Sequence, residues 1–156
     1  MPNYQLTWIT DHIAVGHAPL SYADLISIKQ QGIDAIVNLC EEYCDLHEIE
    51  EKSGFDVYYL PIADECAPDM AKMEKGLEWV AVAIEMDKNV LVHCRYGVGR
   101  TGTFVTAYLI KCGMNMRSAS QKLAKTRATP ANYCQWKLLK NYEKKIGRKR
   151  TNSTGS

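Results

Sequence analysis

The chain has 156 residues, enough for one domain with a hydrophobic core. Apolar residues make up 46% and charged residues 24%, which is typical of a soluble globular protein and excludes a largely disordered or fibrous chain. The longest apolar stretches fall far short of the ~20 residues that a membrane-spanning helix needs, and no basic-then-apolar leader opens the chain. We therefore expect a cytoplasmic protein.

The net charge of +1 gives no electrostatic reason to expect nucleic acid or an anionic membrane as a partner. The distribution is uneven, because residues 137–150 contain seven basic residues and one acidic residue. That segment is either an anion-contacting surface or a solvated basic helix end. No sequence feature indicates an oligomer, so a monomer is assumed.

Strand and helix patterns alternate along the chain, which predicts an α/β fold with a central, mostly parallel sheet flanked by helices. Buried-strand patterns cover residues 12–17, 35–40, 55–60 and 89–93. Helical patterns cover residues 21–32, 41–53, 69–86, 101–112, 116–128 and 130–145. We expect one domain over residues 1–150 and a disordered tail over 151–156.

Several element ends carry local signals. Ser21 with Asp24 makes a capping-box-like helix start, and Gly32 supplies a left-handed helix end. Pro61 is expected to stop the third strand. Pro130 is placed in the first turn of the last helix, where its missing N–H costs nothing.

The cysteines show neither CxxC pairs nor the Cys/His spacing of a zinc site. We therefore expect no metal and no cofactor. Each thiol is expected to be reduced, and to be either a small buried hydrophobe or a reactive group.

The most informative stretch follows the strand at residues 89–93. The strand ends at Cys94, a glycine-containing loop follows, and a helix begins near Arg100. In such a turn the backbone N–H groups can converge while the helix N-terminus adds its positive end, which suits a phosphate-sized dianion. The planar fork of Arg100 can hold two phosphate oxygens. The predicted phosphate-binding residues are Arg95, Tyr96, Gly97, Val98, Gly99 and Arg100.

The positive potential of the loop N–H groups and the helix N-terminus also stabilises a thiolate, so Cys94 is expected to be ionised at neutral pH. A thiolate beneath a bound phosphate is an in-line nucleophile that forms a cysteinyl-phosphate, which water then hydrolyses without a metal. The hydroxyl of Thr101 is placed to hydrogen-bond the sulfur and help it leave. His93 is interpreted as holding the loop by hydrogen bonds rather than acting as a base.

These residues resemble the motif of the cysteine-dependent protein tyrosine phosphatase superfamily, which is His-Cys, five residues, Arg, then Ser or Thr. The motif stands here as His93 to Thr101, followed by the Gly102-Thr103 usual in that family. The resemblance covers about Trp8 to Tyr142 and is closest to the small atypical dual-specificity phosphatases. It implies their fold and the hydrolysis of phosphotyrosine, with phosphoserine and phosphothreonine as further substrates, in phosphorylated proteins.

Departure of the alcohol needs a proton donor on a nearby loop. Asp64, between a strand end and a helix start, is the best candidate, and its loop resembles the general-acid loop of the small dual-specificity phosphatases. Glu65 and Asp69 are the competitors. Asp69 follows Pro68 and is better suited to start a helix.

Two more residues have roles only through the resemblance. The segment around Gln135 looks like the one after the last loop in the family, where Gln135 would contact the site. Some relatives carry an acid where this chain has Ala131, which puts an auxiliary acid from that loop in doubt.

Cys40 lies in a segment like the one that carries the backup cysteine of phosphatase-and-tensin-type lipid phosphatases. This implies a reversible disulfide with Cys94, and the alternative is a plain buried thiol.

One alternative function stays open, and three others are disfavoured. A phosphoinositide or other small-molecule phosphatase would use the same chemistry; the basic segment favours it and the absence of lysine from the loop opposes it. The joint presence of Cys94, Arg100 and Asp64 argues against a catalytically dead phosphate-binding module. Sulfur transfer of the rhodanese type and arsenate reduction are disfavoured by the upstream aspartate and by the helix after Arg100.

Overall fold

A computed structural model of the chain describes residues 3–154, with side chains to residue 148. Strands and helices alternate along most of the chain. The elements are β1 (Thr7–Trp8), β2 (Ile13–Gly16), α1 (Tyr22–Gln30), β3 (Ala35–Cys40), α2 (Leu46–Lys52), β4 (Asp56–Ile62), α3 (Met70–Glu85), β5 (Val90–His93), α4 (Gly99–Lys111), α5 (Met116–Leu123) and α6 (Tyr133–Thr154).

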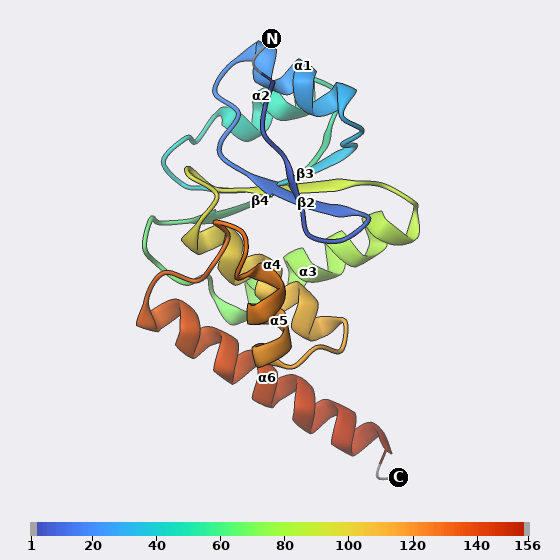
Figure 1. Cartoon of the computed structure of the whole chain (residues 1–156), viewed down its shortest axis with the longest axis vertical. Coiled ribbons are helices and arrows are strands. Elements are labelled where there is room, and N and C mark those ends of the chain that lie inside the picture. Colours follow the sequence, from blue (N-terminus) through green and yellow to red (C-terminus); the bar gives the residue numbers. More distant parts are fainter. Residues whose placement is uncertain (1–2, 155–156) are drawn as a thin grey trace.

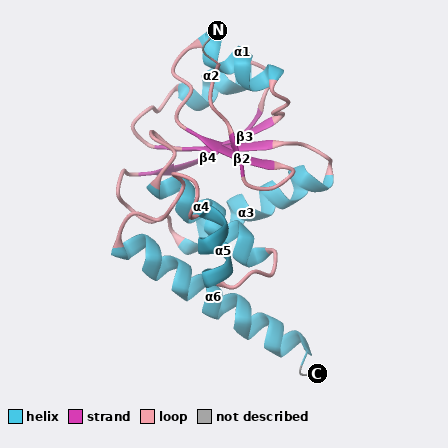
Figure 2. Cartoon of the chain, viewed as in Figure 1, coloured by secondary structure: helices cyan, strands magenta, loops and turns pink. Residues whose placement is uncertain are grey.

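The strands form one sheet in the order β1-β2-β5-β3-β4. The pairs β2–β5, β5–β3 and β3–β4 are parallel, and the short β1 runs antiparallel to β2. Helices α1 and α2 lie on one face of the sheet and α3 to α6 on the other (Figures 1 and 2). The predicted α/β fold with a mostly parallel sheet is confirmed.

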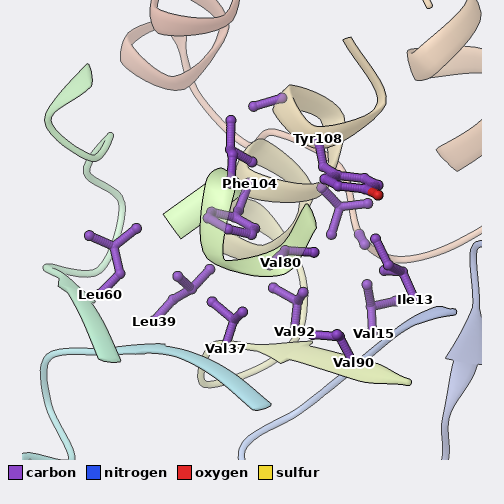
Figure 3. Close-up of a cluster of buried hydrophobic side chains, with 14 of the residues drawn as sticks. Ile13, Val15, Val37, Leu39, Leu60, Val80, Val90, Val92, Phe104 and Tyr108 are labelled. Carbon is purple, nitrogen blue, oxygen red and sulfur yellow. The ribbon is translucent and has the colours of Figure 1, made fainter. Parts of the chain in front are cut away.

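Both faces of the sheet are buried, because successive strand residues point to opposite sides. Ile36 of β3 and Leu91 of β5 pack in the core beneath α1. Their neighbours Val37 and Val92 point to the other side, where they pack in the core that includes Phe104 of α4 (Figure 3). This two-sided burial explains why the central strands read as continuous apolar runs.

The hydrogen bonds at several helix ends agree with the sequence signals. The Ser21 hydroxyl accepts from the backbone N–H of Asp24 at 3.1 Å, which caps α1. Gly32 follows α1 with a φ of +97°, the left-handed conformation predicted for it. The Asp69 carboxylate accepts from the N–H of Lys72 at 3.1 Å and caps α3.

Two boundaries in the first half of the chain differ from the predictions. Helix α2 begins at Leu46 rather than at residue 41, which leaves residues 41–45 as a loop beside the candidate site. Strand β4 continues through Pro61 to Ile62. Because β4 is the last strand of the sheet, the missing N–H of a proline is tolerated there.

The C-terminal boundaries also differ. Helix α6 begins at Tyr133, and Pro130 lies in the preceding loop. Asn132 starts the helix instead, because its side-chain oxygen accepts from the N–H of Gln135 at 3.0 Å. Helix α6 extends to Thr154, so residues 151–154 are helical rather than a disordered tail, and no proline interrupts this stretch. Residues 155–156 of the predicted tail lie outside the described residues.

Over residues 3–154, no helix combines the length and apolar character needed to cross a membrane.

Candidate active site

The predicted phosphate-binding loop connects the end of β5 directly to α4, which begins at Gly99. The first turn of α4 is closed by a hydrogen bond of 2.7 Å from the N–H of Gly102 to the Val98 carbonyl. Gly97 has a φ of +74°, and a Cβ there would lie 2.7 Å from the carbonyl oxygen of Gly16. Only glycine fits this position without moving the β2 end.

Cys94 is buried immediately after β5. The Thr101 hydroxyl donates a hydrogen bond to its sulfur at 3.0 Å. The structure therefore brings together the two residues that the sequence paired. A donor aimed at the sulfur stabilises negative charge on it.

Arg95 and Tyr96 contribute their backbone to the loop and turn their side chains outward. The Arg95 carbonyl accepts from the N–H of Ala18 at 3.0 Å, which ties the loop to the segment after β2. The Arg95 guanidinium lies over the Tyr96 ring, 5.0 Å from its centre, and the tyrosine is 56% exposed. Tyr96 also lines the cavity above Cys94.

The guanidinium of Arg100 is held by Glu42 from the loop after β3. Arg100 Nη1 and Nη2 donate to the two Glu42 carboxylate oxygens at 2.6 and 2.8 Å, and Nη1 also donates to the Ile62 carbonyl at 2.9 Å. Burial lowers the pKa of Arg100, but these bonds to Glu42 and the nearby cysteines raise it above its ordinary value. The bonds to Arg100 in turn lower the pKa of the Glu42 carboxyl. Both groups are therefore charged at neutral pH.

Those bonds use three of the five N–H groups of a guanidinium. The two that remain, Nε–H and one Nη2–H, lie along the other edge of the plane. An edge of this kind matches two phosphate oxygens. Glu42 therefore orients Arg100 and leaves this second edge for a phosphate, with Asp64 Oδ1 lying 3.4 Å from its Nη2.

Sequence reasoning missed Glu42. The available signal was its position directly after a buried strand, since the carboxyl ends of neighbouring parallel strands meet at one edge of the sheet.

Asp64 lies at the site, on the loop between β4 and α3. Its Oδ1 is 3.4 Å from Arg100 Nη2, and the side chain is 60% exposed. Glu65 follows in the left-handed conformation, with a φ of +64°, and donates its N–H to Asp64 Oδ1 at 3.0 Å. Both carboxylates line the cavity, whereas Asp69 caps α3. The structure thus leaves Asp64 and Glu65 as candidate acids.

A cavity of about 370 Å³ opens above Cys94. Residues from the acid loop, the phosphate loop and the segment before α6 line it: Asp64, Glu65, Cys94, Tyr96, Val98, Gly99, Arg100, Arg127, Ala131 and Gln135. Sequence reasoning missed Arg127, which no motif marks.

Gln135 is buried at the start of α6 and links two loops of the site. Its amide donates to the Cys66 carbonyl at 3.1 Å, and its oxygen accepts from the N–H of Ala131 at 2.7 Å. Asn132 donates to the Glu65 carbonyl at 2.6 Å. The start of α6 therefore supports the loop that carries the candidate acids.

His93 and Cys40 are fully buried behind the loop. His93 Nδ1 lies 3.2 Å from the Cys94 carbonyl oxygen, as expected for a residue that holds the loop. The sulfur of Cys40 lies 3.9 Å from the same nitrogen. Burial and the neighbouring Glu42 raise the pKa of the Cys40 thiol, which is therefore neutral at pH 7. A disulfide between Cys40 and Cys94 stays a prediction.

Among the described residues, no group of three or more His, Cys, Asp or Glu side chains is arranged to hold a metal ion.

Comparison with known proteins places these features in a family. A family model described as a polymorphic toxin system DSP-PTPase phosphatase matches residues 17–114. The mouse phosphatidylglycerophosphatase and protein-tyrosine phosphatase 1 is 26% identical over 145 residues, which cover 87% of this chain and 75% of that protein. The Arabidopsis thaliana phosphatidylinositol 3,4,5-trisphosphate 3-phosphatase and protein-tyrosine-phosphatase PTEN1 is 34% identical over 104 residues, which cover 62% of this chain and 23% of that protein.

The solved structure of Tk-PTP in its active form superimposes with a TM-score of 0.80 and 29% identity, covering 89% of this chain and 96% of that one. The family match includes the whole segment from Cys94 to Thr101 and spans more than half of the chain. The chain therefore belongs to the DSP-PTPase family of cysteine-dependent phosphatases, which are hydrolases.

Proposed function

We propose that this phosphatase hydrolyses phosphotyrosine, and also phosphoserine and phosphothreonine, in phosphorylated proteins through a cysteinyl-phosphate intermediate. One observation carries the proposal. The buried Cys94 sulfur accepts a hydrogen bond from Thr101 at 3.0 Å, at the start of a loop that leads into a helix N-terminus. That arrangement stabilises both a thiolate and a phosphate dianion above it.

In the first step the phosphoryl group lies in the loop with its oxygens on the backbone N–H groups and on the second edge of Arg100. The Cys94 thiolate attacks phosphorus, so an S–P bond forms while the P–O bond to the substrate breaks. Asp64 gives a proton to the departing oxygen, which leaves as an alcohol or phenol.

In the second step Asp64, now a carboxylate, removes a proton from a water molecule. That water attacks phosphorus and the S–P bond breaks, which releases inorganic phosphate. The sulfur departs as a thiolate that accepts the Thr101 hydrogen bond. Asp64 ends the cycle protonated, and no metal ion takes part.

The surroundings of the cavity support a protein substrate. Tyr96 is an exposed aromatic side chain at the rim, where it can pack against the ring of a phosphotyrosine. The proposal includes a cytoplasmic location, which suits the exposed free thiols of Cys44, Cys66, Cys112 and Cys134.

A lipid phosphatase is the second candidate, because the name of the mouse relative includes phosphatidylglycerophosphatase activity. Lys137, Lys140 and Lys144 form an exposed stripe on α6, and none of them has an ion pair among the described side chains. Such a stripe would attract an anionic lipid surface.

A substrate comparison separates the two candidates. kcat/KM is measured on a phosphotyrosyl peptide, a phosphoseryl peptide, and vesicles that contain phosphatidylglycerophosphate or a phosphoinositide, with Cys94→Ser as the blank. The proposal predicts the highest value on the phosphotyrosyl peptide. Activity confined to the vesicles would overturn it in favour of the lipid candidate.

The vesicle arm has a matched pair of variants. If lipid is the substrate, charge reversal at Lys137, Lys140 and Lys144 lowers vesicle turnover, whereas charge reversal at the exposed Lys72 and Lys75 of α3 leaves it unchanged. Equal effects of the two variants would argue against a role for the α6 stripe.

A further inference from the structure

Glu50 is a fully buried carboxylate on α2, and the proposed mechanism does not use it. Its Oε2 lies 2.6 Å from His93 Nε2, and its Oε1 accepts from the Asn38 amide at 2.8 Å. A buried carboxylate is unfavourable unless paired and hydrogen-bonded. Glu50 therefore needs both partners.

The protons in this cluster follow from its fixed donors and acceptors. The N–H of Cys40 donates to Asn38 Oδ1 at 2.9 Å, which turns the Asn38 amide group toward Glu50. Glu50 Oε1 must therefore accept, and Oε2 faces His93. The other ring nitrogen, His93 Nδ1, lies against the Cys94 carbonyl oxygen, which can only accept. Nδ1 thus carries a hydrogen.

A second hydrogen lies between Nε2 and Oε2. At 2.6 Å the two atoms share a short charge-assisted hydrogen bond, and an ionised Glu50 requires an N–H at Nε2. His93 then has a hydrogen on both nitrogens and a positive charge, and it adjoins Cys94 in the chain.

We propose that Glu50 is a positioning residue for the phosphatase reaction: it keeps both ring nitrogens of His93 protonated, which places a positive charge beside Cys94 and fixes the carbonyl that starts the phosphate loop. This inference rests on the proposed use of Cys94 as the nucleophile. The charge favours the thiolate at low pH, where the free thiol would otherwise dominate.

The variant Glu50→Gln separates the charge from the packing. The oxygen of the introduced amide can still accept from Asn38, and its NH₂ can donate to His93 Nε2. The ring then keeps only its Nδ1 hydrogen and its bond to Cys94. Every hydrogen bond survives in Glu50→Gln, while the negative charge of Glu50 and the positive charge of His93, which is the one adjacent to Cys94, are lost together. A purely structural role predicts no effect on the chemistry of Cys94.

The other titratable groups near His93 and Cys94 are Cys40 of β3, Arg100 of α4 and Tyr4, with Asp64 and Glu65 on the cavity wall and Glu42 bound to Arg100. Burial raises the pKa of Tyr4 and of Cys40, so both stay neutral, and Arg100 stays charged. All of these groups are the same in the wild type and in Glu50→Gln. A difference in Cys94 reactivity between the two proteins therefore comes from the pair of Glu50 and His93.

The direct test is ¹⁵N NMR of histidine-labelled wild-type protein, in which one-bond N–H coupling distinguishes protonated from bare ring nitrogens. His93 is assigned among the four histidines by three variants that each lack one of the others. Two protonated nitrogens are expected at pH 7.5, and one in Glu50→Gln. A bare Nε2 in the wild type, with the proton on Glu50, would overturn the inference without any variant being needed.

The second readout is the rate at which iodoacetamide alkylates Cys94. Peptide mass spectrometry measures this rate at several pH values. Glu50→Gln is expected to slow alkylation severalfold near pH 6, where a smaller fraction of Cys94 is then thiolate, and to match the wild type near pH 9. Glu51→Gln, an exposed neighbour on α2, is the control and should match the wild type throughout. Equal rates for Glu50→Gln and the wild type at pH 6 would contradict the inference.

Wild-type protein that lacks phosphatase activity but keeps a doubly protonated His93 would instead disprove the proposed function.

Discussion

Glu42 and Arg100 lie 58 positions apart in the chain, yet the carboxylate holds the guanidinium through two hydrogen bonds of 2.6 and 2.8 Å. The contact exists because β3 and β5 are adjacent strands, so the loops that follow them meet at one edge of the sheet. It leaves one edge of the guanidinium for a phosphate. The orientation of Arg100, and not only its charge, is therefore part of the site.

Glu42→Ala should weaken substrate binding. Loss of a hydrogen bond to a charged group typically costs ~1.5–3 kcal/mol, which corresponds to a fall in kcat/KM of about 10- to 100-fold, expressed mainly as a higher KM. Steady-state kinetics on p-nitrophenyl phosphate measure this, with the exposed Glu41→Ala as the control. An unchanged KM would mean that Arg100 keeps its orientation without Glu42.

The same pair should make folding stability depend on pH. Arg100 lowers the pKa of Glu42 below its ordinary value of 4.5, so the folded state binds a proton less readily than the unfolded state. The stabilisation is complete well above pH 4.5 and is lost as pH falls toward the lowered folded value. The difference in unfolding free energy between the wild type and Glu42→Gln, from urea denaturation, should therefore shrink between about pH 6 and pH 3. If the difference in unfolding free energy stays constant over this pH range, the ion pair between Glu42 and Arg100 does not contribute to stability.

Asp64→Asn should slow turnover by a factor that depends on the leaving group. General acid catalysis typically contributes ~10²–10⁴-fold, and its loss matters most when the leaving oxygen is basic. A phosphotyrosyl peptide should lose more activity than p-nitrophenyl phosphate, whose phenol leaves easily. Asp69→Asn is the control, since asparagine preserves the cap of α3. A greater loss in Glu65→Gln than in Asp64→Asn would move the acid role to Glu65.

Cys40 should protect Cys94 from irreversible oxidation by hydrogen peroxide. Peroxide converts the Cys94 thiolate to a sulfenic acid, and the Cys40 thiol then displaces water to form the S–S bond. After peroxide and then dithiothreitol, Cys40→Ser should recover clearly less activity than the wild type. The exposed Cys112→Ser serves as the control. If Cys40→Ser recovers as fully as the wild type, Cys40 is a plain buried thiol.

Local patterns predicted much of this molecule. The strand end, glycine loop and helix start around Cys94 are consecutive in the chain, so the hydrogen bond between Thr101 and Cys94 follows from their spacing. Helix ends at Ser21 and Gly32 were predictable for the same reason, since a cap depends on residues within one turn.

Long-range partners were not predictable in this way. Glu42 reaches Arg100, and Glu50 reaches His93, only because the sheet places β3 beside β5 and α2 over that edge. Hydrophobic periodicity identifies strands but does not give their order. The position of Pro61 shows the same limit, because a proline ends a central strand but is tolerated on the edge strand β4.

If Cys94 carries the phosphoryl group during the reaction, rapid-quench trapping should capture it there. The wild type is mixed with p-nitrophenyl phosphate, quenched in acid within one turnover with a chelator present, and digested for mass spectrometry. We expect one phosphate on the Cys94 peptide of the wild type and none in Cys94→Ser. In Asp64→Asn we expect more of the phosphorylated peptide if hydrolysis becomes slower than transfer. Turnover in Cys94→Ser, or active wild-type enzyme in which the phosphate is trapped on another residue, would contradict it.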